Sequence, residues 1–200
     1  GPNAGGKTVV LKTIGVFSLL AKTGLLLPCQ SATSIEFENI FVLLGDSQNR
    51  EEDLSTFSGH LNQIKKIMTF CNEKSLILLD EGFVGTDPAV GVALARAVLE
   101  YFAEKNATVI ITTHFSSLKT LASEDTRFAN ASMEFETTTL RPTYKLLNGI
   151  PGQSYALELC ERMGLETSII TKASQYYGQE ARRMENILQQ LQEKKLQIEE

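Results

Sequence analysis

Residues 1–8 read GPNAGGKT, the pattern G-x-x-x-x-G-K-[ST] at the start of a helix-forming stretch. The backbone N–H groups of such a loop surround phosphate oxygens, because glycines permit the tight turn and the close approach. The helix that follows points the positive end of its dipole at the anion. Lys7 is expected to reach the β- and γ-phosphates of ATP, and the Thr8 hydroxyl to bind Mg²⁺. The nucleotide-binding residues expected in this loop are Gly1, Pro2, Asn3, Ala4, Gly5, Gly6, Lys7 and Thr8.

A second motif is an apolar run that ends in two acids. Residues 76–81 read LILLDE, in which Asp80 and Glu81 follow a run of the length of a buried strand. This is typical of a Walker B strand, where Asp80 would hold Mg²⁺ through water and Glu81 would polarise the attacking water as general base or orient it. Two acids can also simply cap a strand. Beside the loop at 1–8, they predict nucleotide hydrolysis.

A histidine follows the next apolar strand, in Thr112-Thr113-His114. A lone histidine is more often structural. At the end of the strand after the Walker B strand, where ligands gather in an open α/β sheet, its imidazole could hydrogen-bond the γ-phosphate or the attacking water. We therefore expect His114 and Glu81 to be the catalytic residues.

The spacing of apolar residues places these motifs on an α/β fold. Helices are expected at 7–22, at 56–72 and from Asp87-Pro88 to 102, and buried strands at 75–80 and 108–112, with two further short strands within 35–45. Strands that alternate with helices indicate a mostly parallel sheet flanked by helices, as in P-loop NTPases. The strand that should precede the phosphate loop is expected to lie before Gly1.

Beyond residue 125 the pattern changes. Residues 131–136 and 143–147 predict strands joined by a loop that contains Pro142, as an antiparallel extension of the sheet. C-terminal helices are expected at 153–163 and 167–177. From Glu180 the chain is dense in Glu, Gln, Lys and Arg, which predicts a long exposed helix, as a solvated linker in preference to a short coiled-coil seam.

Composition limits the function classes. The 200 residues carry 19 Lys and Arg against 24 Asp and Glu, a net charge of −5, whereas a protein that wraps nucleic acid by itself needs a clustered basic surface. Cys29, Cys71 and Cys160 form no CxxC pair and predict reduced thiols in a cytosolic protein. No apolar run has the length of a membrane span. The first residue is glycine, so we expect a piece of a longer protein.

Five motifs together resemble the ATPase domain of the MutS family, over nearly the whole chain. They are the loop at 1–8, Ser55-Thr56-Phe57-Ser58, Leu79-Asp80-Glu81, Gly85-Thr86-Asp87-Pro88 and Thr112-Thr113-His114-Phe115. The stretches LRPTYKL at 140–146 and GIPG at 149–152 are similar to the type-two subfamily, whose members carry a C-terminal Smr nuclease domain.

The resemblance implies an ABC-like ATPase that pairs head to tail in a two-fold homodimer. Ser55 and Thr56 of one subunit would contact the nucleotide held by the other, and Asp87 would lie along the dimer seam. Chemistry alone explains Asp87 as a helix N-cap, and likewise Ser55 or Ser58 ahead of the 56–72 helix. The domains implied are a MutS-type ATPase and dimerisation domain at 1–178, whose first strand is missing, and the start of a helical linker at 179–200.

The chain departs from the family pattern at two places. Between Glu81 and Gly85 the family usually has Leu-Gly-Ala, where this chain has Gly82-Phe83-Val84, and Gly59 stands where a serine is more usual. Because the two acids and the Thr-Asp-Pro are retained, the first departure bears on fine positioning and rate rather than on the identity of the site. The second supports a nucleotide contact for Ser55 more strongly than for Ser58.

The resemblance further implies a cytoplasmic protein in which ATP hydrolysis drives action on branched DNA, in recombination suppression, or on stalled ribosomes, through domains outside this chain. No membrane partner is implied. A transporter ATP-binding cassette should show LSGGQ before the Walker B strand, where residues 54–60 read LSTFSGH. The alternative of another class is a non-catalytic dimerisation fragment that binds ATP poorly because its first strand is absent.

Overall fold

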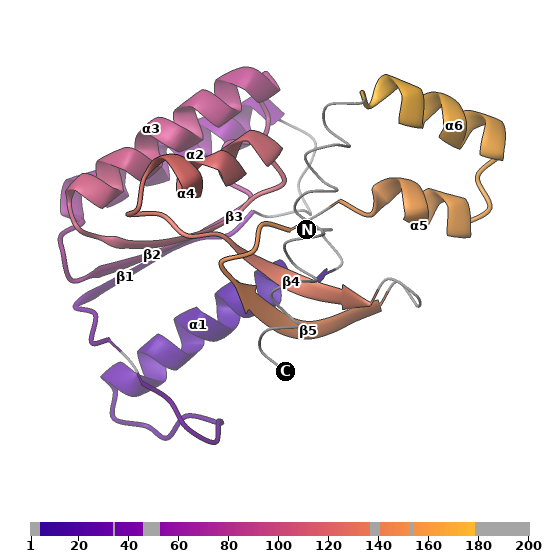
Figure 1. Ribbon diagram of the computed structural model, residues 1–200. Coiled ribbons are helices and arrows are strands. Elements are labelled where there is room, and N and C mark those ends of the chain that lie inside the picture. Colours follow the sequence, from indigo (N-terminus) through magenta and orange to yellow (C-terminus); the bar gives the residue numbers. More distant parts are fainter. Residues whose placement is uncertain (1–4, 34, 46–52, 137–140, 153, 179–200) are drawn as a thin grey trace. The chain divides into compact units, whose positions relative to one another are not determined.

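The computed structural model describes residues 5–33, 35–45, 53–136, 141–152 and 154–178, which divide into two compact units (Figure 1). The larger unit runs from Thr8 to Arg127, and the other joins Gly1–Lys7 to Phe128–Glu200. The helix expected from Glu180 lies outside the described residues.

A parallel sheet of three strands forms the centre of the larger unit. The strands β1 (Asn39–Leu43), β2 (Ser75–Asp80) and β3 (Thr108–Thr112) lie in the order β1-β2-β3. The register pairs Asn39 with Ser75 on one side of β2 and Asp80 with Thr112 on the other. Because the strands run in the same direction, the residues at their carboxyl ends meet at one edge of the sheet. The parallel part of the predicted fold is therefore confirmed.

Helices cover both faces of this sheet. The helix α1 (Lys7–Lys22) lies on one face, and α2 (Asp53–Phe70), α3 (Pro88–Glu104) and α4 (Leu121–Glu124) lie on the other (Figure 1). Successive side chains of β2 point to opposite faces. Leu76 and Leu78 pack with Leu11 of α1. On the other face the buried core consists of Leu43, Ile64, Ile67, Ile77, Leu79, Phe83, Ala95, Phe102 and Leu118. All six residues of β2 are buried, because both faces are covered.

The start of α3 agrees with the sequence prediction. The carboxylate of Asp87 accepts hydrogen bonds from the backbone N–H groups of Ala89 and Val90, over 2.9 and 3.2 Å, and Pro88 occupies the first turn. A side-chain acceptor before the first turn satisfies N–H groups that have no partner within the helix. After β3, a short 3₁₀ helix η2 (Ser116–Thr120) leads into α4.

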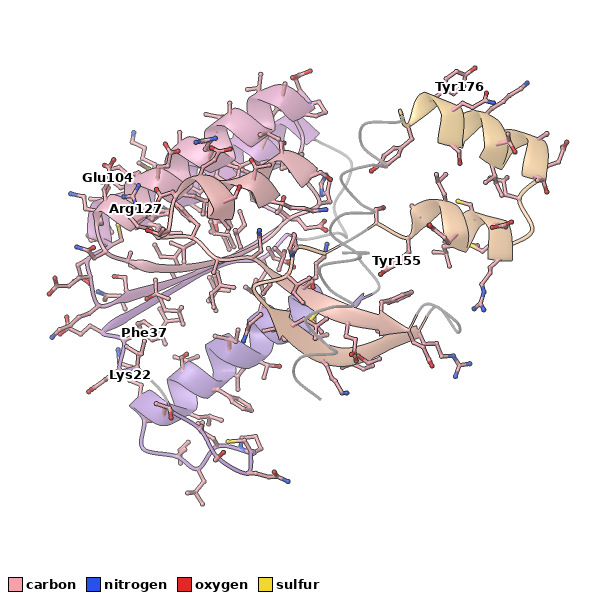
Figure 2. All side chains as sticks on the ribbon, viewed as in Figure 1. Lys22, Phe37, Glu104, Arg127, Tyr155 and Tyr176 are labelled. Carbon is pink, nitrogen blue, oxygen red and sulfur yellow. The ribbon has the colours of Figure 1, made fainter. Side chains whose placement is uncertain are left out.

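Two strand predictions need correction. Residues 39–43 form the only strand within the described part of 35–45, because β2 offers partners only from Ser75 onward. The stretch before β1 instead joins α1 to the sheet: Lys22, labelled with Phe37 in Figure 2, donates from its ammonium group to the carbonyl oxygen of Glu38. β3 is only half-buried before Thr112, since it is an edge strand of the three-stranded sheet.

The second unit contains an antiparallel pair and two helices. β4 (Ala131–Glu136) pairs with β5 (Arg141–Asn148), and α5 (Ala156–Arg162) and α6 (Thr167–Tyr176) follow. The pair forms a two-stranded sheet of its own, so the predicted extension of the parallel sheet is wrong. Pro142 lies in β5, opposite Phe135, and not in a loop. Proline is tolerated there because an edge strand leaves half of its N–H groups outside the ladder.

The three cysteines form no disulfide in the structure. Cys29, Cys71 and Cys160 are free, and burial raises the pKa of the Cys71 thiol. Among the described residues, no helix combines the length and the apolar character needed to cross a membrane.

Candidate functional site

Asp80, the last residue of β2, lies where the carboxyl ends of the strands meet. Its side chain is buried, with 5% of the residue exposed. One carboxylate oxygen, Oδ2, accepts a hydrogen bond from the hydroxyl of Thr8 over 2.8 Å. The other, Oδ1, accepts a hydrogen bond from the hydroxyl of Thr112. The two residues predicted to hold Mg²⁺, 72 positions apart in the sequence, are therefore in direct contact.

The donor set at this point suits a small hard cation. Mg²⁺ prefers oxygen ligands and is usually bound through one or two protein oxygens, with water and substrate phosphates completing its shell. The Thr8 hydroxyl and Asp80 Oδ2 are such oxygens, at the start of α1 and the end of β2. A buried carboxylate with two hydroxyl donors also has its charge compensated by hydrogen bonds.

Glu81 leaves the strand in an uncommon backbone conformation. Its φ is 47°, in the left-handed region that residues with a side chain seldom adopt. Its N–H group donates to both the carbonyl oxygen and the hydroxyl oxygen of Thr112, each over 3.1 Å. These bonds hold the half-buried Glu81 beside Asp80 at the end of the sheet. The catalytic role of Glu81 stays a prediction.

The turn after Glu81 accommodates the departure from the family pattern. Phe83, where the family usually has glycine, has a φ of 72°, and its side chain is buried in the core with Leu79 and Ala95. A Cβ at Gly82 would meet no atom within 4 Å. The turn thus retains a backbone shape that favours glycine, and the burial of the Phe83 ring compensates for the steric cost.

His114 lies directly after β3 and is exposed. Its ring lies 4.6 Å from the ring of Phe115, between centroids, at a tilt of 47°. Phe115 in turn belongs to the side chains packed against the core. Because Asp80 pairs with Thr112 in the register, His114 lies at the same edge of the sheet as Asp80 and Glu81. Its catalytic role stays a prediction.

An aromatic residue that the motifs did not indicate lies beside the phosphate loop. The ring of Tyr144 in β5 comes so close to Gly6 that a Cβ on the glycine would lie 3.1 Å from Tyr144 Cδ1. Gly6 has a φ of +89° and Tyr144 one of 61°, so both backbones are in the left-handed region. Tyr144 is 65% exposed. No feature of the sequence motifs indicates this contact, because it depends on the pairing of β5 with β4.

Comparison with known proteins now identifies the family. The family described as MutS domain V matches residues 1–193 of the chain. The chain belongs to the MutS family. The predicted resemblance, including the type-two subfamily, is confirmed by relatives named Endonuclease MutS2.

Three of these relatives show how much of the MutS2 proteins the chain represents. The protein of Clostridium botulinum (strain Eklund 17B / Type B) is 48% identical over 197 residues, covering 98% of this chain and 25% of the relative. That of Ruminiclostridium cellulolyticum is 49% identical over 189 residues, covering 94% and 24%. That of Caldicellulosiruptor bescii is 44% identical over 201 residues, covering 100% and 26%. The chain spans about a quarter of the length of these curated relatives.

Ser55 and Thr56 of this MutS domain lie in the first turn of α2, and Ser58 lies further along it. The N-cap explanation for Ser55 or Ser58 is therefore wrong, because α2 already begins at Asp53, ahead of the apolar spacing that predicted it. Asp87, by contrast, is the N-cap of α3, and its place on a dimer seam stays a prediction.

Part of the MutS phosphate loop can be followed. Gly5 is buried, Gly6 has the left-handed φ noted above, and Lys7 begins α1. The predicted phosphate contacts of Gly1, Pro2, Asn3 and Ala4 lie outside the described residues. A helix that starts at the lysine of the motif is the arrangement in which its N-terminal N–H groups face an anion.

Proposed function

We propose that this MutS domain binds ATP with Mg²⁺ and hydrolyses it to ADP and phosphate. The observation that carries the proposal is the 2.8 Å hydrogen bond from the Thr8 hydroxyl to Asp80. It joins the threonine of the phosphate loop to the acid of the Walker B strand, the pair that holds the metal in P-loop NTPases. A purely structural role would not require two residues of these motifs to meet in a buried position.

Each remaining residue has a role that its position supports. Lys7 binds the β- and γ-phosphates, and the loop glycines let backbone N–H groups approach them. Bound Mg²⁺ would neutralise charge that develops on the phosphates. Glu81 orients and deprotonates the attacking water, and His114 donates a hydrogen bond to the γ-phosphate. Both side chains belong to residues that directly follow neighbouring strands.

We propose that Tyr144 contributes to nucleoside binding at Gly6 of the phosphate loop, since the two residues belong to the same unit. Its exposed ring lies next to Gly6 of the phosphate loop, where a base attached to the bound phosphates can stack on it. Aromatic rings bind bases through such stacking without distinguishing them strongly. We therefore add Tyr144 to the nucleotide-binding residues that the sequence predicts.

At the level of the whole protein, we propose a cytoplasmic homodimer in which Ser55 and Thr56 contact the nucleotide of the partner subunit. ATP hydrolysis then drives action on branched DNA or stalled ribosomes through domains outside this chain. The relatives are named endonucleases. The net charge of −5 supports nucleic-acid contact elsewhere than on this domain, because phosphate backbones attract basic surfaces.

The experiment is a titration with a fluorescent ATP analogue and an assay of phosphate release, in the full-length protein and in this chain. Lys7→Ala should weaken binding at least about tenfold, because it removes a cation beside the phosphates. Lys12→Ala is the matched control, since Lys12 is an exposed lysine of the same helix. Equal affinity of the two variants would exclude the loop as the phosphate site. Weak binding without hydrolysis by this chain, beside tight binding and turnover by the full-length protein, would favour the non-catalytic alternative, in which the fragment binds ATP poorly.

A further inference from the structure

Thr112, the last residue of β3, connects the two acids of the site. It pairs with Asp80 in the register of the sheet, and only 8% of it is exposed. Its hydroxyl donates a hydrogen bond to Asp80 Oδ1 and accepts one from the N–H of Glu81 over 3.1 Å. The carbonyl oxygen of Thr112 accepts from the same N–H, also over 3.1 Å.

The chemistry of the groups fixes the direction of these bonds. A backbone N–H can only donate and an ionised carboxylate can only accept, so the single hydroxyl proton of Thr112 must point to Asp80. The hydroxyl oxygen then has a lone pair left for Glu81. Each oxygen of the Asp80 carboxylate is thereby held by a different hydroxyl group, Oδ1 by Thr112 and Oδ2 by Thr8. With both oxygens held, the carboxylate plane cannot rotate freely.

We propose that Thr112 is a positioning residue for the ATPase reaction, and this rests on the proposed function. Its hydroxyl keeps Asp80 Oδ2 directed at the Thr8 hydroxyl, where Mg²⁺ would be held, and holds the left-handed backbone of Glu81 at the end of the strand. Thr112 touches neither nucleotide nor water in this role. It acts through the two acids, as the partners of metal ligands do when they set ligand orientation.

The test compares Thr112→Val with Thr112→Ser in the full-length protein. Valine keeps the shape and the β-branched side chain that suits a strand, and removes only the hydroxyl. Serine keeps the hydroxyl and removes the methyl group. Thr108→Val is the matched control, because Thr108 is the first residue of the same strand, at the end away from the acids.

Two readouts are needed, one of which does not depend on turnover. The first is the pair kcat and KM for ATP. The second is Mn²⁺ binding in the presence of a non-hydrolysable ATP analogue, measured from the electron paramagnetic resonance signal of free Mn²⁺. Thr112→Val should lower kcat and weaken Mn²⁺ binding by about 10- to 100-fold each, the usual effect of removing the partner of a metal ligand, with KM within about threefold. Thr112→Ser should recover most of both, and Thr108→Val should match the wild type.

A folded Thr112→Val protein with wild-type kcat and Mn²⁺ affinity would overturn the proposal, and so would a serine variant as impaired as the valine one. If Thr112→Val does not fold, Thr112→Ala replaces it, because alanine and serine differ only in the hydroxyl. Failure of the proposed function looks different. The wild-type protein would then release no phosphate from ATP, whatever residue stands at position 112.

Discussion

The carbonyl oxygen of Phe83 lies so close to α3 that a Cβ on Gly91 would stand 2.7 Å from it. The same Cβ would be 3.3 Å from Cζ of Phe115. Gly91 therefore lets the turn after the Walker B strand and the residue after His114 pack against one point of α3. Only a residue without a side chain fits there.

Gly91→Ala should lower the free energy of unfolding by about 1–3 kcal/mol, as is usual for overpacking. The preference of helices for alanine would by itself raise stability by up to about 1 kcal/mol. Gly59→Ala in α2 measures that preference alone, because a Cβ at Gly59 meets no atom within 4 Å. Urea unfolding of the two variants should give opposite signs. A gain in stability for both would show that the turn moves away from α3 without cost.

Glu81→Gln should slow ATP turnover at least about 10²-fold, because a general base typically contributes that much, while ATP still binds. Single-turnover phosphate release and analogue binding measure the two effects separately. Glu73→Gln is the control, since Glu73 is exposed and precedes β2 at the end opposite Glu81. An unchanged kcat in Glu81→Gln would remove Glu81 from the catalytic residues.

The role of Ser55 in the partner's site can be tested by mixing two inactive variants. In a Ser55→Ala and Lys7→Ala heterodimer, one composite site carries both changes and the other neither. Mixing should therefore restore activity that each variant lacks alone. Subunit exchange is verified by mass spectrometry of the mixture. If exchange occurs without any recovery, Ser55 acts within its own subunit.

Tyr144→Ala should weaken ATP binding by about tenfold, since stacking on an aromatic ring contributes about 1–3 kcal/mol per base. Binding of inorganic triphosphate should not change, because it has no base. Tyr144→Phe should bind ATP as the wild type does, and Tyr176→Ala serves as control because Tyr176 is 86% exposed on α6 (Figure 2). Isothermal titration calorimetry measures all four proteins. An equal loss of ATP and triphosphate affinity in Tyr144→Ala would exclude stacking.

Asp125 should stabilise the larger unit at neutral pH, and this contribution should be lost in acid. A hydrogen bond from the Arg127 side chain lowers the pKa of Asp125 below its ordinary value of 3.8, because it favours the charged carboxylate. A lowered pKa in the folded state adds stability above the ordinary pKa, and this stability is lost as the pH falls through the lowered one. Asp125→Asn should therefore melt below the wild type at pH 7, and the two should converge in acid. A difference in Tm that is the same at pH 7 and in acid would contradict this linkage.

The sequence predicted those features that depend on local pattern. The apolar run of β2 and the Asp87-Pro88 start of α3 have residue types that suit only a few structures, and both were placed correctly. The length of β1 was not, because strand ends depend on the partner: the paired register begins at Asn39 and Ser75, and Glu38 donates one backbone hydrogen bond, to the carbonyl oxygen of Lys74. Likewise, nothing in the local pattern of 141–148 shows that Pro142 pairs with Phe135.

Some residues of the candidate site could be predicted from local motifs, and others could not. Thr8 and Asp80 were predicted as a pair because their motifs have a known spatial relation. Thr112 and Tyr144 were missed as contributors, since their partners, Asp80 and Gly6, lie far away in the sequence and belong to other elements. The left-handed φ of Phe83 could not be predicted either, because bulky residues rarely adopt a positive φ.

The complete burial of β2 determines where the domain opens when it fluctuates. A strand covered on both faces exposes its amides mainly when the unit unfolds, so we expect the amides of β2 to exchange slowly. Asp80 is attached to that strand, whereas Thr86 and Asp87 follow in a turn near the surface, where local opening is frequent. A ligand held at Asp80 is thus anchored to the part of the domain that opens last. The turn beside Asp80 can therefore open locally while β2 stays folded.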